Sequence, residues 1–84
     1  MVKKKQRKNP WTEILESHSF GQISAEILKA SGNQLSRQTI KEWADGNFRP
    51  GSINQDHIIM AYPEVTVEDI REHYERKQQE KTNG

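Results

Sequence analysis

The clearest helical signal in this chain is the stretch Ser36-Arg37-Gln38-Thr39-Ile40-Lys41-Glu42-Trp43-Ala44-Asp45-Gly46. Ser36 can cap the start of a helix, and Gly46 can end it in a left-handed conformation. Ile40, Trp43 and Ala44 recur at helical spacing and form one apolar stripe. The remaining positions are mostly polar. The stretch therefore predicts a short helix with one buried face and one solvent-facing face.

Two helices are predicted before this stretch. Asn9-Pro10 fits an N-cap followed by a first-turn proline, and Phe20-Gly21 is expected to end that segment. Ser24 is the expected cap of the second helix, which Gly32-Asn33 ends because both residues tolerate the left-handed conformation. The inward faces are Trp11, Ile14, Leu15 and His18 in the first helix, and Ile27 and Leu28 in the second.

Two more helices are predicted after it. Residues 52–55 (Ser-Ile-Asn-Gln) fit a capping box, and Tyr62-Pro63 stops the helix that follows. Residues 66–69 (Thr-Val-Glu-Asp) form a second start signal, with Val65 and Ile70 as a hydrophobic staple. The inward faces are Ile53, His57, Ile58, Met60 and Ala61 in one helix, and Val67, Ile70 and Tyr74 in the other.

These segments predict an all-α fold, a compact bundle of about five short helices without strands. We expect a flexible basic arm over residues 1–9, a folded domain over 10–75 and a polar, frayed tail over 76–84. Phe48 is expected to pack on the core. The predicted core is Trp11, Ile14, Leu15, Ile27, Leu28, Leu35, Ile40, Trp43, Ile58, Ile70 and Tyr74.

Composition excludes several classes of protein. The 84 residues allow one small domain, and the absence of cysteine excludes disulfides and thiolate metal sites. No apolar run is long enough to cross a membrane, which predicts a cytoplasmic protein. His18, His57 and His73 have no metal-ligand spacing, and His18 and His57 fall on inward faces as structural residues. We therefore expect no catalytic site, no metal and no cofactor.

Charge is distributed unevenly along the chain despite a net charge of +1. The first eight residues contain five cations and no acid, a pattern that attracts phosphate but also serves as a solubilising tail. The predicted helix at 36–45 adds side chains suited to major-groove readout, since Arg37 can pair with guanine and Gln38 with adenine. An ordinary exposed helix face is the alternative. The arm cations are Lys3, Lys4, Lys5, Arg7 and Lys8.

Residues 36–50 resemble the Cro and phage-repressor (XRE-like) family of helix-turn-helix proteins. Ile40, Trp43, Gly46 and Pro50 match the family spacing, and the lysine-rich start is similar to the lambda repressor arm. The likeness covers roughly residues 10–75 and implies a lambda-repressor-like fold. Gly32 lies eight residues before Ile40 where the family has six. That departure predicts a turn longer by two residues, and it places Leu28 where the family has a small alanine.

The resemblance implies a sequence-specific regulator, expected to be a repressor, that binds double-stranded DNA as a homodimer in the nucleoid. The alternative is a protein-interaction module of the same shape, such as an antitoxin, a phage-encoded inhibitor of a host protein, or a recombination or packaging accessory factor. Bases would be contacted by Arg37, Gln38, Lys41 and Glu42. Phosphates would be contacted by Ser36, Asn47, Arg49 and the five arm cations, Lys3, Lys4, Lys5, Arg7 and Lys8.

Overall fold

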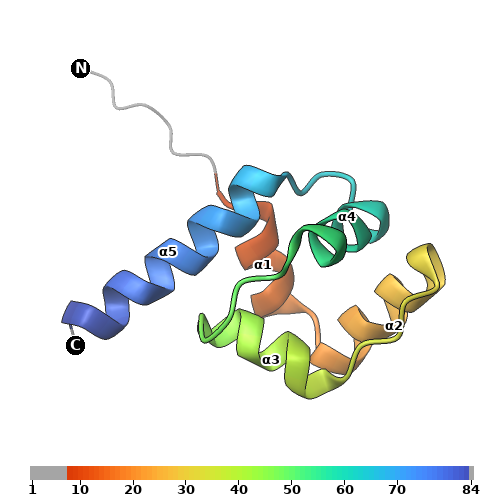
Figure 1. Ribbon diagram of the computed structural model, residues 1–84, viewed down its shortest axis with the longest axis horizontal. Coiled ribbons are helices and arrows are strands. Elements are labelled where there is room, and N and C mark those ends of the chain that lie inside the picture. Colours follow the sequence, from red (N-terminus) through yellow and green to blue (C-terminus); the bar gives the residue numbers. More distant parts are fainter. Residues whose placement is uncertain (1–7, 84) are drawn as a thin grey trace.

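The computed structural model describes residues 8–83, and these residues form five α-helices without a strand (Figure 1). This confirms the predicted all-α, five-helix fold class. The helices are α1 (Pro10–Ser17), α2 (Phe20–Ser31), α3 (Arg37–Asp45), α4 (Ser52–Ala61) and α5 (Val67–Asn83).

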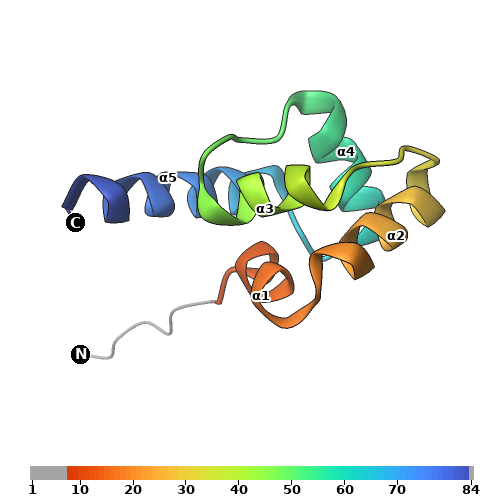
Figure 2. The same cartoon turned by 90° about the horizontal axis from the view of Figure 1, so that it is seen from below.

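The helices surround one apolar core. Helix α2 packs against α4 and α3, while α1 packs against α5, which also contacts α3 and α4. The carboxyl-terminal half of α5 runs past the end of α3, where Lys77 and Gln78 contact Gly46, and its tip projects from the bundle (Figures 1 and 2). The buried apolar residues are Trp11, Ile14, Leu15, Ile23, Ile27, Ile40, Trp43, Ile58, Tyr62, Val65 and Ile70.

Most of the predicted core is buried, but one residue was placed wrongly. Leu28 is 41% exposed, and Ile23 takes a core position that the sequence did not indicate. Ile23 shares a face with Ile27 because α2 begins at Phe20, before the predicted start at Ser24. Leu35 is partly buried against the core, and Tyr74 is half-buried. Phe48 is 64% exposed, so the expectation that it packs on the core is wrong.

Helix α2 begins earlier than the sequence predicted. Phe20 is its first residue, and the Ser19 hydroxyl caps it by accepting a hydrogen bond from the Gln22 N–H. Ser24 therefore lies inside the helix, where its hydroxyl donates to the Leu35 carbonyl at 2.5 Å. The predicted break at Phe20-Gly21 is thus a start. Both serines can cap a helix, and the start at Ser19 places Ile23 on the buried face together with Ile27.

Helix α4 lacks the predicted capping box. Gly51 is its N-cap and provides no side-chain hydrogen bond, while Ser52 is already the first helical residue. The Gln55 amide donates instead to the Pro50 carbonyl at 2.9 Å. Two residues assigned to its inward face point outward, since Ile53 is 69% exposed and Met60 56% exposed.

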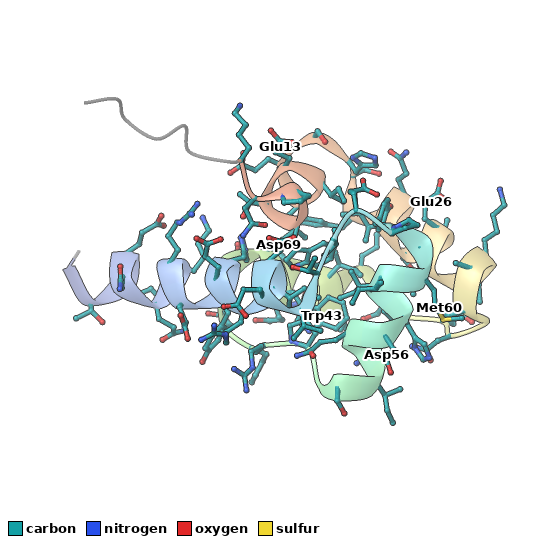
Figure 3. The ribbon with its side chains drawn as sticks, turned by 90° about the horizontal axis from the view of Figure 1, so that it is seen from above. Glu13, Glu26, Trp43, Asp56, Met60 and Asp69 are labelled. Atoms are coloured by element: carbon teal, nitrogen blue, oxygen red, sulfur yellow. The ribbon has the colours of Figure 1, made fainter. Side chains whose placement is uncertain are left out.

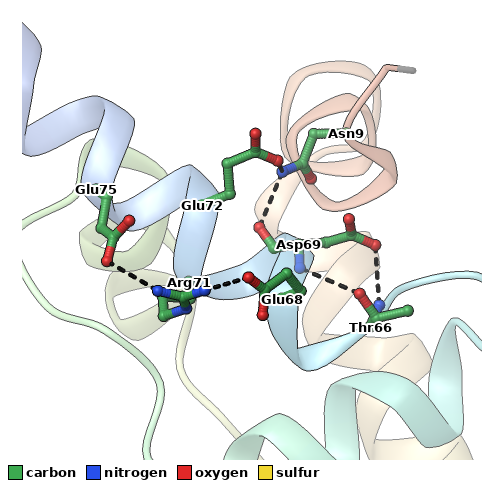
Figure 4. Close-up of polar contacts among 7 residues, drawn as sticks. All are labelled: Asn9, Thr66, Glu68, Asp69, Arg71, Glu72 and Glu75. Atoms are coloured by element: carbon green, nitrogen blue, oxygen red, sulfur yellow. Dashed lines mark hydrogen bonds and ion pairs between the residues drawn. The ribbon is translucent and has the colours of Figure 1, made fainter. Parts of the chain in front are cut away.

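Helix α5 begins as predicted but continues further. The Thr66 hydroxyl accepts from the Asp69 N–H, and the Asp69 carboxylate accepts from the Thr66 N–H (Figure 4). Val67 is 48% exposed, so it is not on the inward face. The helix extends to Asn83, so residues 76–83 are helical where the sequence suggested a polar tail.

Two buried polar residues attach α1 to α5. Asn9 caps α1 through hydrogen bonds from the N–H groups of Trp11 and Thr12, as predicted. Its amide nitrogen also donates to the Asp69 carbonyl at 2.9 Å (Figure 4). His73 is 4% exposed and lies between the Thr12 hydroxyl and α3. The sequence instead favoured His18 and His57 as the inward histidines, and both are only half-buried.

Candidate nucleic-acid interface

Helix α3 is held firmly by its apolar side and by both caps. Ile40 is fully buried and Trp43 is 4% exposed, with the Trp43 ring centroid 6.4 Å from that of Trp11 (Figure 3). The Ser36 hydroxyl accepts from the Thr39 N–H at 3.1 Å. Gly46 ends the helix at a φ of 79°, which favours glycine. These features confirm the predicted helix boundaries and leave its polar side toward solvent.

The connection between α2 and α3 runs back along α2 instead of forming a tight turn. Gly32 ends α2 with a φ of 79°, and Asn33 donates to Asn54 of α4 at 3.3 Å. Leu35 then reaches the Ser24 hydroxyl in the first half of α2. Consequently the amino ends of α2 and α3 lie side by side. A Cβ atom built on Gly21 would lie 3.3 Å from the Arg37 Nε atom.

Arg37 stands apart from the other polar side chains of α3. Within residues 8–83, no hydrogen bond or ion pair engages its exposed guanidinium group. Lys41 forms an ion pair with Asp45 at 2.8 Å, and Gln38 donates to Glu42 at 2.6 Å. Arg37 is therefore the cation of α3 that is available to an outside partner without breaking an internal contact.

The charged groups of this face stabilise one another in their ionised forms. Hydrogen bonds from Asn47 and Gln38 lower the pKa of the Glu42 carboxyl. The hydrogen bond with Lys41 lowers the pKa of Asp45, and the same contact raises the pKa of Lys41. The face thus presents both positive and negative charges near neutral pH.

The residues predicted to contact phosphate differ in whether their side chains already have partners within the protein. The Ser36 hydroxyl is occupied as the α3 cap, and Asn47 bonds to Glu42 and to Lys81. The Arg49 guanidinium carbon lies 5.9 Å from the centre of the Tyr74 ring. Arg49 remains exposed, so an anion can still reach it from the solvent side.

Lys8 is the one cation of the arm that the structure describes. Its ammonium group lies 3.5 Å from the Glu13 carboxylate, and both side chains are more than half exposed. Lys8 precedes α1, which packs on α5 and not on the outer face of α3. The other arm cations predicted to contact DNA, Lys3, Lys4, Lys5 and Arg7, lie outside the described residues.

An open hollow of about 390 Å³ borders Arg37 between α2 and the α2–α3 connection. Its α2 wall is made of small or apolar residues, and Leu28 is exposed on this wall. The lining residues are Gly21, Ser24, Ala25, Leu28, Gln34, Leu35, Ser36 and Arg37. The hollow lets a bulky partner approach Arg37 from the α2 side.

Two further features concern the class of site. Residues 8–83 contain no cluster of three or more side chains that could hold a metal ion. No helix in the described part of the chain is both long and apolar enough to cross a membrane.

Comparison with protein-family models found no match, and neither a curated protein nor a solved structure matched the chain. The likeness of residues 36–50 to the Cro and phage-repressor family therefore stays a prediction.

Proposed function

We propose that this protein is a sequence-specific DNA-binding regulator that places α3 in the major groove. The observation that carries the proposal is the exposed guanidinium group of Arg37, which has no partner among residues 8–83 and lies on a helix anchored by Ile40 and Trp43. A groove-reading helix needs this division between a rigid apolar side and a free polar side. The first turn of α3 also has room to approach DNA, because Gly21 and the hollow lie beside it.

Each polar residue of α3 has a matching base edge. Arg37 can donate two hydrogen bonds to guanine O6 and N7, and Gln38 can pair with adenine. Glu42 can accept from cytosine N4 and would disfavour a nearby phosphate. Lys41 first exchanges Asp45 for a DNA acceptor, a change that costs little because exposed ion pairs contribute little stability. Arg49 supports this arrangement with a phosphate contact at the far end of α3.

The regulatory mechanism that fits a domain of this size is occupation of a site. Repression follows if the bound protein blocks access to overlapping DNA. Two copies on a two-fold symmetric site would place two α3 helices about one helical turn of DNA apart. This proposal includes a homodimer and a cytoplasmic, nucleoid-associated location.

Selection of duplexes from a random library tests the proposal. The full chain is expected to enrich one motif at physiological salt and again at higher salt. Arg37→Ala should weaken binding to that motif by about 1–3 kcal/mol and relax one base position. Lys29→Ala is the matched control, because it removes an exposed α2 cation that lies outside α3. Binding without any motif, lost as salt rises, would contradict groove readout.

The second candidate function is that of a protein-interaction module, which one observation favours. Ile53 and Met60 are exposed and seven residues apart, so they lie on one side of α4. The double substitution Ile53→Asp and Met60→Asp should abolish binding to a protein partner. The DNA motif selected by the chain should stay the same. If instead the selected motif loses its symmetry and the molar mass in solution halves, this side of α4 is the homodimer contact.

A further inference from the structure

Four polar side chains form a continuous series of hydrogen bonds from the end of α5 to the outer face of α3. The Lys81 ammonium donates to the Asn47 side-chain oxygen at 2.5 Å. The Asn47 amide nitrogen donates to Glu42 Oε1 at 2.6 Å, and the Gln38 amide nitrogen donates to Glu42 Oε2 at 2.6 Å. Each carboxylate oxygen of Glu42 therefore has its own donor.

The backbone around Asn47 is held from both sides. Its N–H donates to the Glu42 carbonyl at 2.9 Å, while Gln78 of α5 donates to the Gly46 carbonyl at 2.5 Å. A Cβ atom on Gly46 would clash with Lys77 Cβ, so α5 packs directly on this corner. The position of the Asn47 side chain thus depends on the last turns of α5.

These contacts change what Asn47 and Glu42 can do. Both polar atoms of the Asn47 side chain are already bonded, which leaves it poorly suited to the phosphate contact that the sequence predicted. A free Glu on a helix surface samples several rotamers, and ordering it on binding costs entropy. The two hydrogen bonds restrict the Glu42 side chain before binding and lower its pKa, and each oxygen keeps a lone pair for a base.

We propose that Asn47 and Lys81 are positioning residues that fix Glu42 and Gln38 on α3, so that the end of α5 determines the base preference of the neighbouring helix. This inference rests on the proposed DNA-binding function. The partner is double-stranded DNA with a cytosine facing Glu42, because a fixed carboxylate accepts from the cytosine amino group. Residues 76–83 of α5, which look like a polar tail in the sequence, thereby become part of the specificity of the protein.

Duplex selection with single-residue variants of the full chain tests this inference. Glu42→Gln first identifies the base position that Glu42 reads. Asn47→Ala should then lower the preference at that same position by roughly threefold or more, as expected for directly coupled residues. Gln79→Ala is the matched control on the exposed side of α5 and should leave the motif unchanged. Lys81→Arg should keep the preference, whereas Lys81→Met should reduce it.

A double substitution separates positioning from stability. In the Glu42→Gln background, Asn47→Ala should have little further effect on base preference, because its target is already altered. Equal losses of affinity on every sequence would overturn the inference and make Asn47 a phosphate contact. An unchanged motif in Asn47→Ala would also overturn it while leaving the proposed function in place. No motif from the unsubstituted chain would overturn both.

Discussion

Helices α3 and α4 are neighbours in the chain and similar in length, with 9 and 10 residues, but the sequence predicts them unequally. In α3 the apolar residues share one side, and its cap, its end and its buried face all agree with the prediction. In α4 the apolar residues Ile53, Ile58, Ile59 and Met60 point in several directions. Only Ile58 is fully buried. When the apolar residues of a helix share one side, the sequence predicts which side is buried. When they are spread around the helix, the packing of the other helices determines the buried side.

The largest change in the free energy of unfolding is expected from the buried side of α4, compared with its exposed side. Ile58→Ala removes a fully buried side chain and should lower the free energy of unfolding by about 2–5 kcal/mol. Ile53→Ala alters an exposed residue of the same type and should change it by less than about 0.5 kcal/mol. Urea denaturation of both variants measures the difference. Equal losses at low protein concentration would mean that the exposed side of α4 is covered within the monomer.

The next effect compares the two glycines that end α2 and α3. Both have a φ of 79°, so alanine costs about 1–2 kcal/mol of backbone strain at either position. Gly46→Ala should destabilise further, because its Cβ atom would meet Lys77 of α5, while Gly32 has open space. Thermal unfolding of the two variants should therefore rank Gly46→Ala below Gly32→Ala. The reverse order would show that the end of α5 does not rest on α3.

A smaller effect compares the serines at the starts of α3 and α4. Ser36→Ala removes a hydroxyl that caps α3 and should cost about 1 kcal/mol. Ser52→Ala should be nearly neutral, since Ser52 lies inside α4 and provides no cap. Denaturation curves under identical conditions measure both. If Ser52→Ala lowered the free energy of unfolding as much as Ser36→Ala, Ser52 would cap α4 as the sequence predicted.

The smallest effect is expected on the pH dependence of the contact between α5 and α3. Burial lowers the pKa of His73 below its ordinary value of 6.5, and the neutral ring donates through Nε2 to the Ala44 carbonyl at 3.1 Å. The unfolded chain then binds the proton more readily. The contribution of neutral His73 to the free energy of unfolding should be fully present above pH 6.5. It should be lost as the pH falls through the lowered pKa of the folded protein.

Unfolding measured across this pH range, with His73→Gln as the control, tests the assignment. The control should lose the decline that His73 causes, because glutamine does not titrate. An identical decline in both proteins would assign it to other groups.

The candidate site was only partly predictable from the sequence. Arg37, Gln38, Lys41 and Glu42 were named because the apolar spacing of α3 leaves them on the polar side. Nothing local indicated that Asn47 would be occupied by Glu42 and Lys81, because Lys81 is 34 residues further along the chain. The one available signal was the run of helix-forming residues after Arg76, whose polar composition is also typical of a tail.

The sequence by itself determined the helical class, the boundaries of α3, and the caps at Asn9, Thr66 and Gly46. These features depend on residues within one or two turns of each other, so local hydrogen bonding and spacing suffice. The tertiary structure alone decided which serine starts α2, which side of α4 is buried, and how far α5 extends. In each case two local solutions are close in free energy, and contacts with a distant helix select one of them.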